Sequence, residues 1–176
     1  RLGEVLPNCA NKITIISPAP NITPATQVVS APNTAERLSP VAALLSKKTK
    51  YFLSVGRLVP RKGFAAAITA IAQLGETYRD WHYVIAGSGP DQAVLERLVE
   101  QYTLQNHVHL LGEVSLAELK LLYQNCEFFI FPAQQLADGD FEGYGTVIVE
   151  ANSFGKPALG TRSGGVSDAI KNGITG

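Results

Sequence analysis

The chain has 176 residues, of which 45% are hydrophobic and 17% charged, so it is long enough to bury one sizeable core. Its 15 lysine and arginine residues balance 15 aspartate and glutamate residues, which disfavours nucleic acid or an anionic membrane as a partner. Two cysteines, Cys9 and Cys126, are too few for a disulfide framework. We expect both to be small buried residues in a reducing compartment.

No apolar run in the sequence approaches the length of a membrane span, and no signal peptide is visible. The chain begins at Arg1 without a methionine and stops at Gly176 in mid-pattern. We therefore expect it to be an excerpt of a longer protein.

Residues 1–50 have the composition of a linker. The pattern is consistent with a helix end at residues 2–9, a short strand at residues 13–16 and a helical turn at residues 41–45. Prolines interrupt a polar stretch at Pro18, Pro20, Pro24, Pro32 and Pro40. This composition favours a partly disordered loop packed on the edge of the domain that follows.

From residue 51 onward the sequence alternates between strand and helix patterns. The expected strands are residues 51–55, 82–86, 108–111, 127–131 and 158–161, and another begins at residues 174–176. The expected helices include residues 64–74, 94–102, 115–123 and 146–154, the third opened by the capping-box spacing of Ser115 and Glu118. Repeated strand-helix units predict an α/β fold with a doubly wound parallel sheet. Ligands of such sheets bind beyond the carboxyl ends of the strands, so the loops that follow strands are the candidate sites.

One such loop carries an acid and two glycines directly before a short apolar helix. Gly143 and Gly145 allow the backbone to approach a ligand closely, and the free amides of a helix starting at Thr146 form an anion site. Glu142 precedes that site and Glu150 lies one turn inside it. These features favour a pocket for a sugar joined to a phosphate. The alternative is a loop acid and a solvated helix acid without a ligand.

The segment Glu142-Gly143-Tyr144-Gly145, with Glu150 following, resembles the E-x7-E motif of retaining glycosyltransferases with the GT-B fold. The family is the group 1 glycosyltransferases, also called glycosyltransferase family 4, which includes sucrose and mannosyl transferases. It usually has Phe where Tyr144 stands.

The resemblance covers residues 51–176 and implies the C-terminal half of a GT-B fold, a Rossmann-like domain that binds the donor nucleotide sugar. It implies that residues 1–50 are the interdomain segment and linker from an N-terminal Rossmann-like domain of the same protein.

The loop after the first strand runs from Gly56 to Gly63 and resembles the family signature G-R-x-x-x-x-K-G. Arg57 and Lys62 occupy the matching places, whereas Arg61 lies outside the pattern. Two cations at a strand end, opposite a helix N-terminus, can share a diphosphate. A basic surface turn is the simpler interpretation.

The loop after the second strand contains Gly87, Ser88, Gly89 and Pro90, and resembles the family's G-x-G-P loop, whose backbone approaches the nucleotide. A strand, G-x-G and a helix also begin a dinucleotide fingerprint. The third glycine of that fingerprint is replaced by Gln92, which disfavours an NAD site. A tight turn that requires small residues remains an alternative for Gly89.

The third strand is followed by Glu113 and Val114, where the resemblance implies that the backbone reads the edge of the base. His107 and His109 are two positions apart, so their side chains point to the same side of that strand and could share a metal. A third ligand at useful spacing is missing from the sequence, which favours ordinary surface or satisfied histidines.

The long loop after the fourth strand contains Asp138 and Asp140. Asp-x-Asp binds a metal and diphosphate in the other major glycosyltransferase fold, but the topology expected here favours a solvated loop. After the fifth strand come Gly164 and Gly165, followed by Asp168 where the family more often has Glu. Such glycines would expose backbone amides to an anion.

The resemblance implies transfer of a glycosyl (hexosyl) group with retention to an unknown sugar, lipid or small-molecule acceptor. Arg57, Lys62 and the amides near Gly145 and Thr146 would take the charge of the leaving diphosphate. Glu142 would hold hydroxyls of the donor sugar.

Glu150 would hold the ribose hydroxyls. No metal and no cofactor is implied, because side-chain cations supply the positive charge. The implied location is the cytoplasm, or the periphery of the inner membrane, and the excerpt alone is expected to be inactive. The alternatives are an epimerase or phosphorylase of the same fold, a non-catalytic sensor of sugar nucleotides, and an α/β domain with unrelated ligands.

Overall fold

The structure is a computed structural model, and it describes residues 40–47, 49–75 and 80–176. The helix end expected at residues 2–9, the strand expected at 13–16, the first four prolines of the linker and Cys9 lie outside the described residues. The proposed division at residue 50 stays a prediction.

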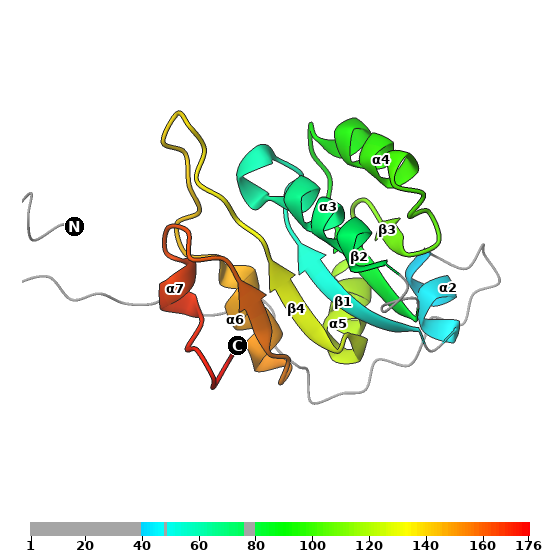
Figure 1. The fold of residues 1–176 in the computed structure, drawn as a ribbon. Coiled ribbons are helices and arrows are strands. Elements are labelled where there is room, and N and C mark those ends of the chain that lie inside the picture. The colour runs from blue at the N-terminus through cyan, green and yellow to red at the C-terminus, as the bar shows by residue number, and fades with distance from the viewer. Residues whose placement is uncertain (1–39, 48, 76–79) are drawn as a thin grey trace, which may run out of the picture.

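The described chain forms a five-stranded parallel sheet with the strand order β3-β2-β1-β4-β5. The strands are β1 (Lys50–Val55), β2 (Trp81–Ala86), β3 (Val108–Leu110), β4 (Phe128–Phe131) and β5 (Ala158–Gly160). The helices are α2 (Pro40–Ser46), α3 (Phe64–Leu74), α4 (Gln92–Gln101), α5 (Leu116–Asn125), α6 (Thr146–Ser153) and α7 (Val166–Ala169), with a 3-10 turn η2 (Pro60–Lys62) before α3. This architecture confirms the doubly wound parallel fold expected from the sequence (Figure 1).

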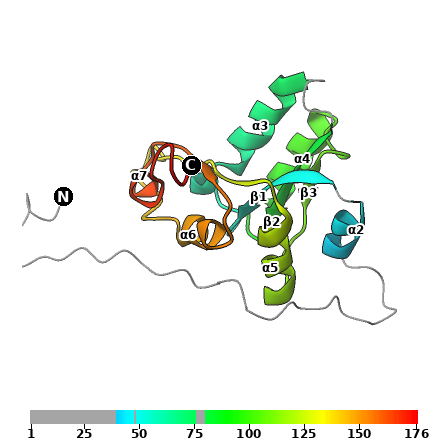
Figure 2. The ribbon, with the colours of Figure 1, turned by 90° about the horizontal axis from the view of Figure 1, so that it is seen from below.

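Helices cover both faces of the sheet. Figure 2 shows α3 and α4 on one side of the strands and α2, α5 and α6 on the other. Neighbouring residues of β1 point into different clusters, since Phe52 packs with α3 and α4, whereas Leu53 packs with α2, α5 and α6. Strands buried on both faces read as continuous apolar runs, as Phe128–Phe131 of β4 does.

Helix α2 contributes to the core although the sequence analysis counted its residues with the linker. Val41 and Leu44 are buried in the cluster shared with α5 and α6. The helical turn expected at residues 41–45 is confirmed and is slightly longer. Cys126 is buried and free, as expected. Among the described helices, none is long and apolar enough to cross a membrane.

The strand expected at residues 174–176 is wrong. These residues close a turn, in which the Thr175 amide donates to the Lys171 carbonyl at 2.9 Å and the Lys171 amide donates to the Thr175 hydroxyl at 2.9 Å. Gly173 has a φ of 74°, which permits the tight reversal. The apolar Ile174 resembled a strand start, but the chain turns back on Lys171, and the Thr175 carbonyl accepts a hydrogen bond from the Ala158 amide of β5 at 2.8 Å.

A cluster of histidines lies at the edge of the sheet between β2 and β3. His82 Nδ1 and His109 Nε2 are 2.8 Å apart, and the two rings stack with centroids 5.1 Å apart. The His107 ring lies 5.5 Å from that of His82. Burial lowers the pKa of His109 from 6.5 to about 4, and the charges of His82, Lys47 and His107 act in the same direction. Burial, His107 and Lys47 also lower the pKa of His82.

This cluster predicts a loss of stability in acid. Folded His109 takes up its proton at a lower pH than an unfolded histidine, so the unfolded chain binds more protons between about pH 6.5 and pH 4. The free energy of unfolding should be highest above pH 7. It should fall by on the order of 1 kcal/mol between pH 7 and pH 5, allowing for solvent screening. Urea unfolding at several pH values measures the slope.

The variant His109→Gln removes the titrating ring and should flatten that slope. An unchanged slope in His109→Gln would show that other groups carry the acid sensitivity.

Candidate functional site

An open pocket of about 570 Å³ lies at the carboxyl edge of the sheet, between the loops that follow β1, β2 and β3. It is lined by Arg57, Gly87, Ser88, Gly89, Pro90 and Glu113. Five residues predicted from three separate motifs therefore meet here, and Pro90 joins them. The predicted Val114 does not line this pocket and packs against the buried core instead.

The glycines of the β2 loop allow two backbone segments to touch. A Cβ on Gly87 would collide with the carbonyl oxygen of Gly56, and a Cβ on Gly89 would collide with that of Leu58. The Leu58 amide donates to the Ser88 carbonyl at 2.9 Å. Close packing of the two loops is therefore enough to explain both glycines, as the tight-turn interpretation of Gly89 anticipated.

The pocket contains groups of both charges. Arg57 contributes a guanidinium to its lining, and Glu113 contributes a carboxylate. The Ser88 hydroxyl donates to Glu113 Oε1 at 2.6 Å, which holds that acid at one end of the pocket.

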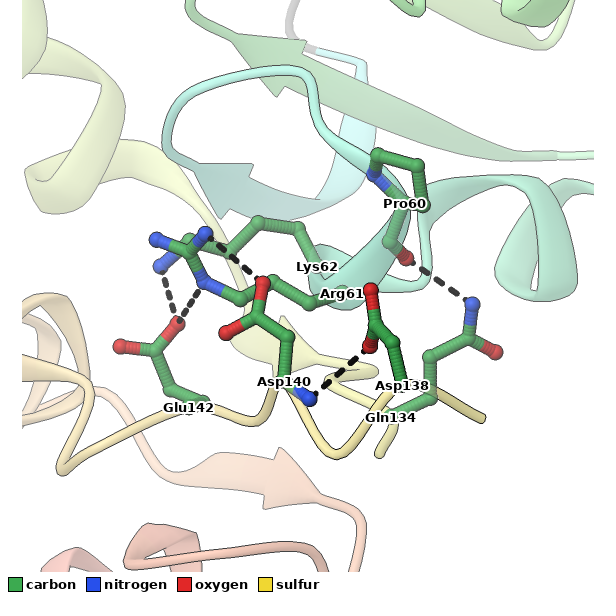
Figure 3. A network of polar contacts seen from close by, with 7 residues as sticks. All are labelled: Pro60, Arg61, Lys62, Gln134, Asp138, Asp140 and Glu142. Atoms are coloured by element: carbon green, nitrogen blue, oxygen red, sulfur yellow. Dashed lines mark hydrogen bonds and ion pairs between the residues drawn. The ribbon is translucent and has the colours of Figure 1, made fainter. Parts of the chain in front are cut away.

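A second group of residues forms near Phe131, at the end of β4, and Figure 3 shows its ion pair between Lys62 and Glu142. Lys62 Nζ lies 2.7 Å from Glu142 Oε2, and the two side chains are only 11% and 14% exposed. The same ammonium lies 4.7 Å from the centroid of the Phe131 ring, a distance typical of cation–π attraction. A Cβ on Gly56 would lie 3.5 Å from Lys62 Cε, so Gly56 lies between this group and the pocket.

The start of helix α6 reaches the same ring. Gly145 is the N-cap with a φ of 76°, and a Cβ there would lie 2.9 Å from Phe131 Cε1. The Lys62 ammonium and the N-cap of α6 therefore lie against the same aromatic ring at the end of β4, and their joint binding of an anion stays a prediction. In the same loop Gly143 is exposed, and Tyr144 and Thr146 are half-buried.

The structure separates the two predicted acids. Glu142 faces cations, whereas Glu150 is 3% exposed in the core and accepts a hydrogen bond from the Tyr123 hydroxyl at 3.0 Å. Burial and the charge of Glu150 raise the pKa of Tyr123, so the phenol remains a donor. Tyr123 ends a helix expected from the sequence, and no role was predicted for its hydroxyl.

The loop after β5 fastens the loop that carries Glu142. The Gly165 amide donates to the Glu142 carbonyl at 3.1 Å, and a Cβ on Gly165 would collide with the Gly143 carbonyl. The expectation that this amide is open to an anion is therefore wrong, because it already has a backbone partner. Asp168 is exposed on α7.

An ion-pair network around Arg61 was not predicted from the sequence. Arg61 Nη1 lies 3.4 Å from Asp140 Oδ2, and Arg61 Nε lies 3.8 Å from Glu142 Oε2. Asp138 Oδ1 accepts a hydrogen bond from the Asp140 amide at 3.0 Å. Both aspartates are exposed, as the solvated-loop interpretation expected. Within the described residues, no group of three or more His, Cys, Asp or Glu side chains could hold a metal ion.

The comparison with protein families matches residues 37–176 to the family described as Glycosyl transferases group 1. The chain is 31% identical over 124 residues to the amylovoran biosynthesis glycosyltransferase AmsK of Erwinia amylovora, covering 70% of this chain and 30% of AmsK. It is 32% identical over 123 residues to a GDP-mannose-dependent phosphatidylinositol monomannoside mannosyltransferase of Mycolicibacterium smegmatis, covering 69% of this chain and 32% of that protein. The chain thus spans about a third of the length of these relatives.

A solved structure shares the fold. HepE of Anabaena, crystallised with UDP and glucose, superimposes with a TM-score of 0.62 at 23% identity, over 79% of this chain and 37% of HepE. At that identity the likeness concerns the fold alone.

Alanine substitutions at two glycines of the site should affect the free energy of unfolding very differently. Gly165→Ala would push a Cβ into the Gly143 carbonyl and should lower the free energy of unfolding by about 2 kcal/mol or more. Gly143→Ala meets no atom within 4 Å and should change it by less than about 0.5 kcal/mol. Thermal unfolding of the two variants compares them. Equal losses would mean that the β5 loop does not rest on the Gly143 backbone.

Proposed function

This chain belongs to the group 1 glycosyltransferases, and from that membership we propose that it forms the donor-binding, C-terminal Rossmann-like domain of a retaining GT-B enzyme. The substrate is a nucleotide-diphosphate sugar, whose hexosyl group passes to an acceptor. The observation that carries the proposal is the meeting of Lys62, Glu142 and the N-terminus of α6 around Phe131.

A diphosphate fits between the two groups of residues. Arg57 lines the pocket, and the Lys62 ammonium lies beyond Gly56, over the Phe131 ring that the N-cap of α6 also approaches. When the glycosidic bond breaks, negative charge develops on the leaving oxygen, and preorganised cations and amides stabilise that charge. These side chains supply the positive charge in our proposal, so it includes no metal or other cofactor.

Glu142 and Glu150 are the two acids of the E-x7-E motif. Glu142 lies beside the cations and accepts hydrogen bonds from hydroxyls of the donor sugar. Glu150, oriented by Tyr123, accepts those of the ribose. The Gly87–Gly89 loop and the segment of Glu113 and Val114 form the nucleotide side of the site.

The acceptor is a sugar, a lipid or a small molecule, and an N-terminal Rossmann-like domain of the same protein supplies its binding site. Length supports this division, because the chain spans about a third of AmsK. We propose a cytoplasmic enzyme that acts in solution or at the periphery of the inner membrane.

An epimerase or phosphorylase of the same fold would use the same pocket without adding a sugar to a new acceptor. A sensor of sugar nucleotides would bind the donor without turnover. Product analysis of the full-length protein with a labelled sugar nucleotide separates these functions from a transferase.

Binding of nucleoside diphosphates tests the proposal directly. Calorimetry with UDP, GDP and ADP should reveal weak binding of at least one of them, whereas NAD should not bind. HepE was crystallised with UDP and the mycobacterial relative depends on GDP-mannose, so UDP and GDP come first. Tight binding of NAD with none of the three diphosphates would reject a transferase.

A pair of variants tests the cationic site. Lys62→Ala should weaken the diphosphate about tenfold or more, because it removes a charge-assisted contact. Asp138→Ala, in the exposed loop, should change binding less than about twofold. A chelator should have no effect. If a chelator and Asp138→Ala cause equal losses, the diphosphate is bound through a metal instead.

A further inference from the structure

Glu142 depends on cations for its place in the site. Its Oε2 is buried and lacks a neutral hydrogen-bond donor among the described residues. The atom is held by Lys62 Nζ at 2.7 Å and by Arg61 Nε at 3.8 Å. A carboxylate this little exposed is unfavourable unless a positive group stays beside it.

The proposed function places two demands on Lys62. Its ammonium binds the donor diphosphate, yet in this structure it is the nearest partner of Glu142. A lysine side chain is a flexible stem with a compact charge, so it can turn from one anion to the other. Glu142 then needs a second cation, or its carboxylate loses its position when the sugar arrives.

Arg61 is placed to provide that second cation. Its guanidinium lies between Glu142 and Asp140, with Nη1 3.4 Å from Asp140 Oδ2 (Figure 3). A guanidinium is a rigid planar fork that binds two acids at once, which an ammonium does less well. Asp140 thereby orients the fork, and the same loop carries Glu142.

The backbone of Arg61 is fixed as well. The Gln134 amide donates to the Arg61 carbonyl at 2.8 Å, and Gln134 Nε2 donates to the Pro60 carbonyl at 2.9 Å. The turn η2 is therefore fastened to the loop after β4 at two successive backbone carbonyls. The backbone that carries Arg61 is thus anchored independently of the Lys62 side chain.

We propose that Arg61 is a positioning residue for the donor sugar. It holds the Glu142 carboxylate in the site while Lys62 turns to the diphosphate, and Asp140 orients it. The inference rests on the proposed roles of Lys62 and Glu142. Arg61 lies outside the motif on which the family resemblance was based.

The test compares a nucleoside diphosphate with its sugar nucleotide in the full-length protein. Arg61→Gln should weaken UDP or GDP about threefold at most, because the fork acts on the diphosphate only indirectly, by freeing Lys62 from Glu142. It should weaken the matching UDP- or GDP-hexose and lower kcat/KM about tenfold, because Glu142 is no longer held. Arg97→Gln, on the exposed face of α4, removes the same charge elsewhere and should change neither.

A double-mutant cycle isolates the pair. In a Glu142→Gln background, Arg61→Gln should cost no further loss of sugar-nucleotide affinity. Arg61→Lys keeps the charge without the fork and should give an intermediate loss. Thermal unfolding accompanies each variant, so a loss of folding is recognised separately.

Three results would overturn the inference: equal losses for diphosphate and sugar nucleotide, an undiminished loss in the Glu142→Gln background, or no effect of Arg61→Gln. If the wild-type protein binds neither diphosphates nor sugar nucleotides, the proposed function itself fails.

Discussion

Lys62 and Glu142 lie on loops far apart in the sequence, and their ion pair joins the loop after β1 to the loop after β4. Both side chains are largely withdrawn from water, so each charge would be unfavourable without the other. The aromatic ring of Phe131 lies beneath the ammonium, and the N-cap of α6 rests on the same ring. One contact therefore sets where the cation, the acid and the helix tip stand. An anion that binds here must share the lysine with the acid or take it over.

Close backbone packing makes this contact possible. Gly63 carries a φ of 70°, and a Cβ there would collide with the carbonyl of Pro132, so the turn that presents Lys62 rests directly on the end of β4. Gly165 rests in the same way on the loop of Glu142. Side chains at these two points would separate the loops by the width of a methyl group or more. The loop conformations that bring Lys62 to Glu142 would then be lost.

Much of the fold follows from the sequence because periodicity reports burial. The apolar strands and helix faces after residue 50 appear where expected, and the capping box of Ser115 and Glu118 forms with both of its hydrogen bonds. Contacts between side chains on different elements could not be predicted from the sequence. His82 meets His109 only because β2 and β3 pair in one register, and Arg61 meets Asp140 only because two loops converge. The turn at residues 174–176 was not predicted because Ile174 resembled a strand start, whereas hydrogen bonds between Lys171 and Thr175 turn the chain back.

The two acids of one motif illustrate the limit of spacing as evidence. Glu142 is compensated by charges, whereas Glu150 accepts a hydrogen bond from the neutral hydroxyl of Tyr123. An approaching diphosphate competes with Glu142 for Lys62, but it does not compete for the phenol. In the function proposed above, a ribose hydroxyl is a donor of the same kind as the Tyr123 hydroxyl, so Glu150 would exchange one for the other, or hold both, without losing a charged partner. In that proposal the electrostatic cost of binding a donor falls on the Glu142 side of the site, where Arg61 provides a second positive charge.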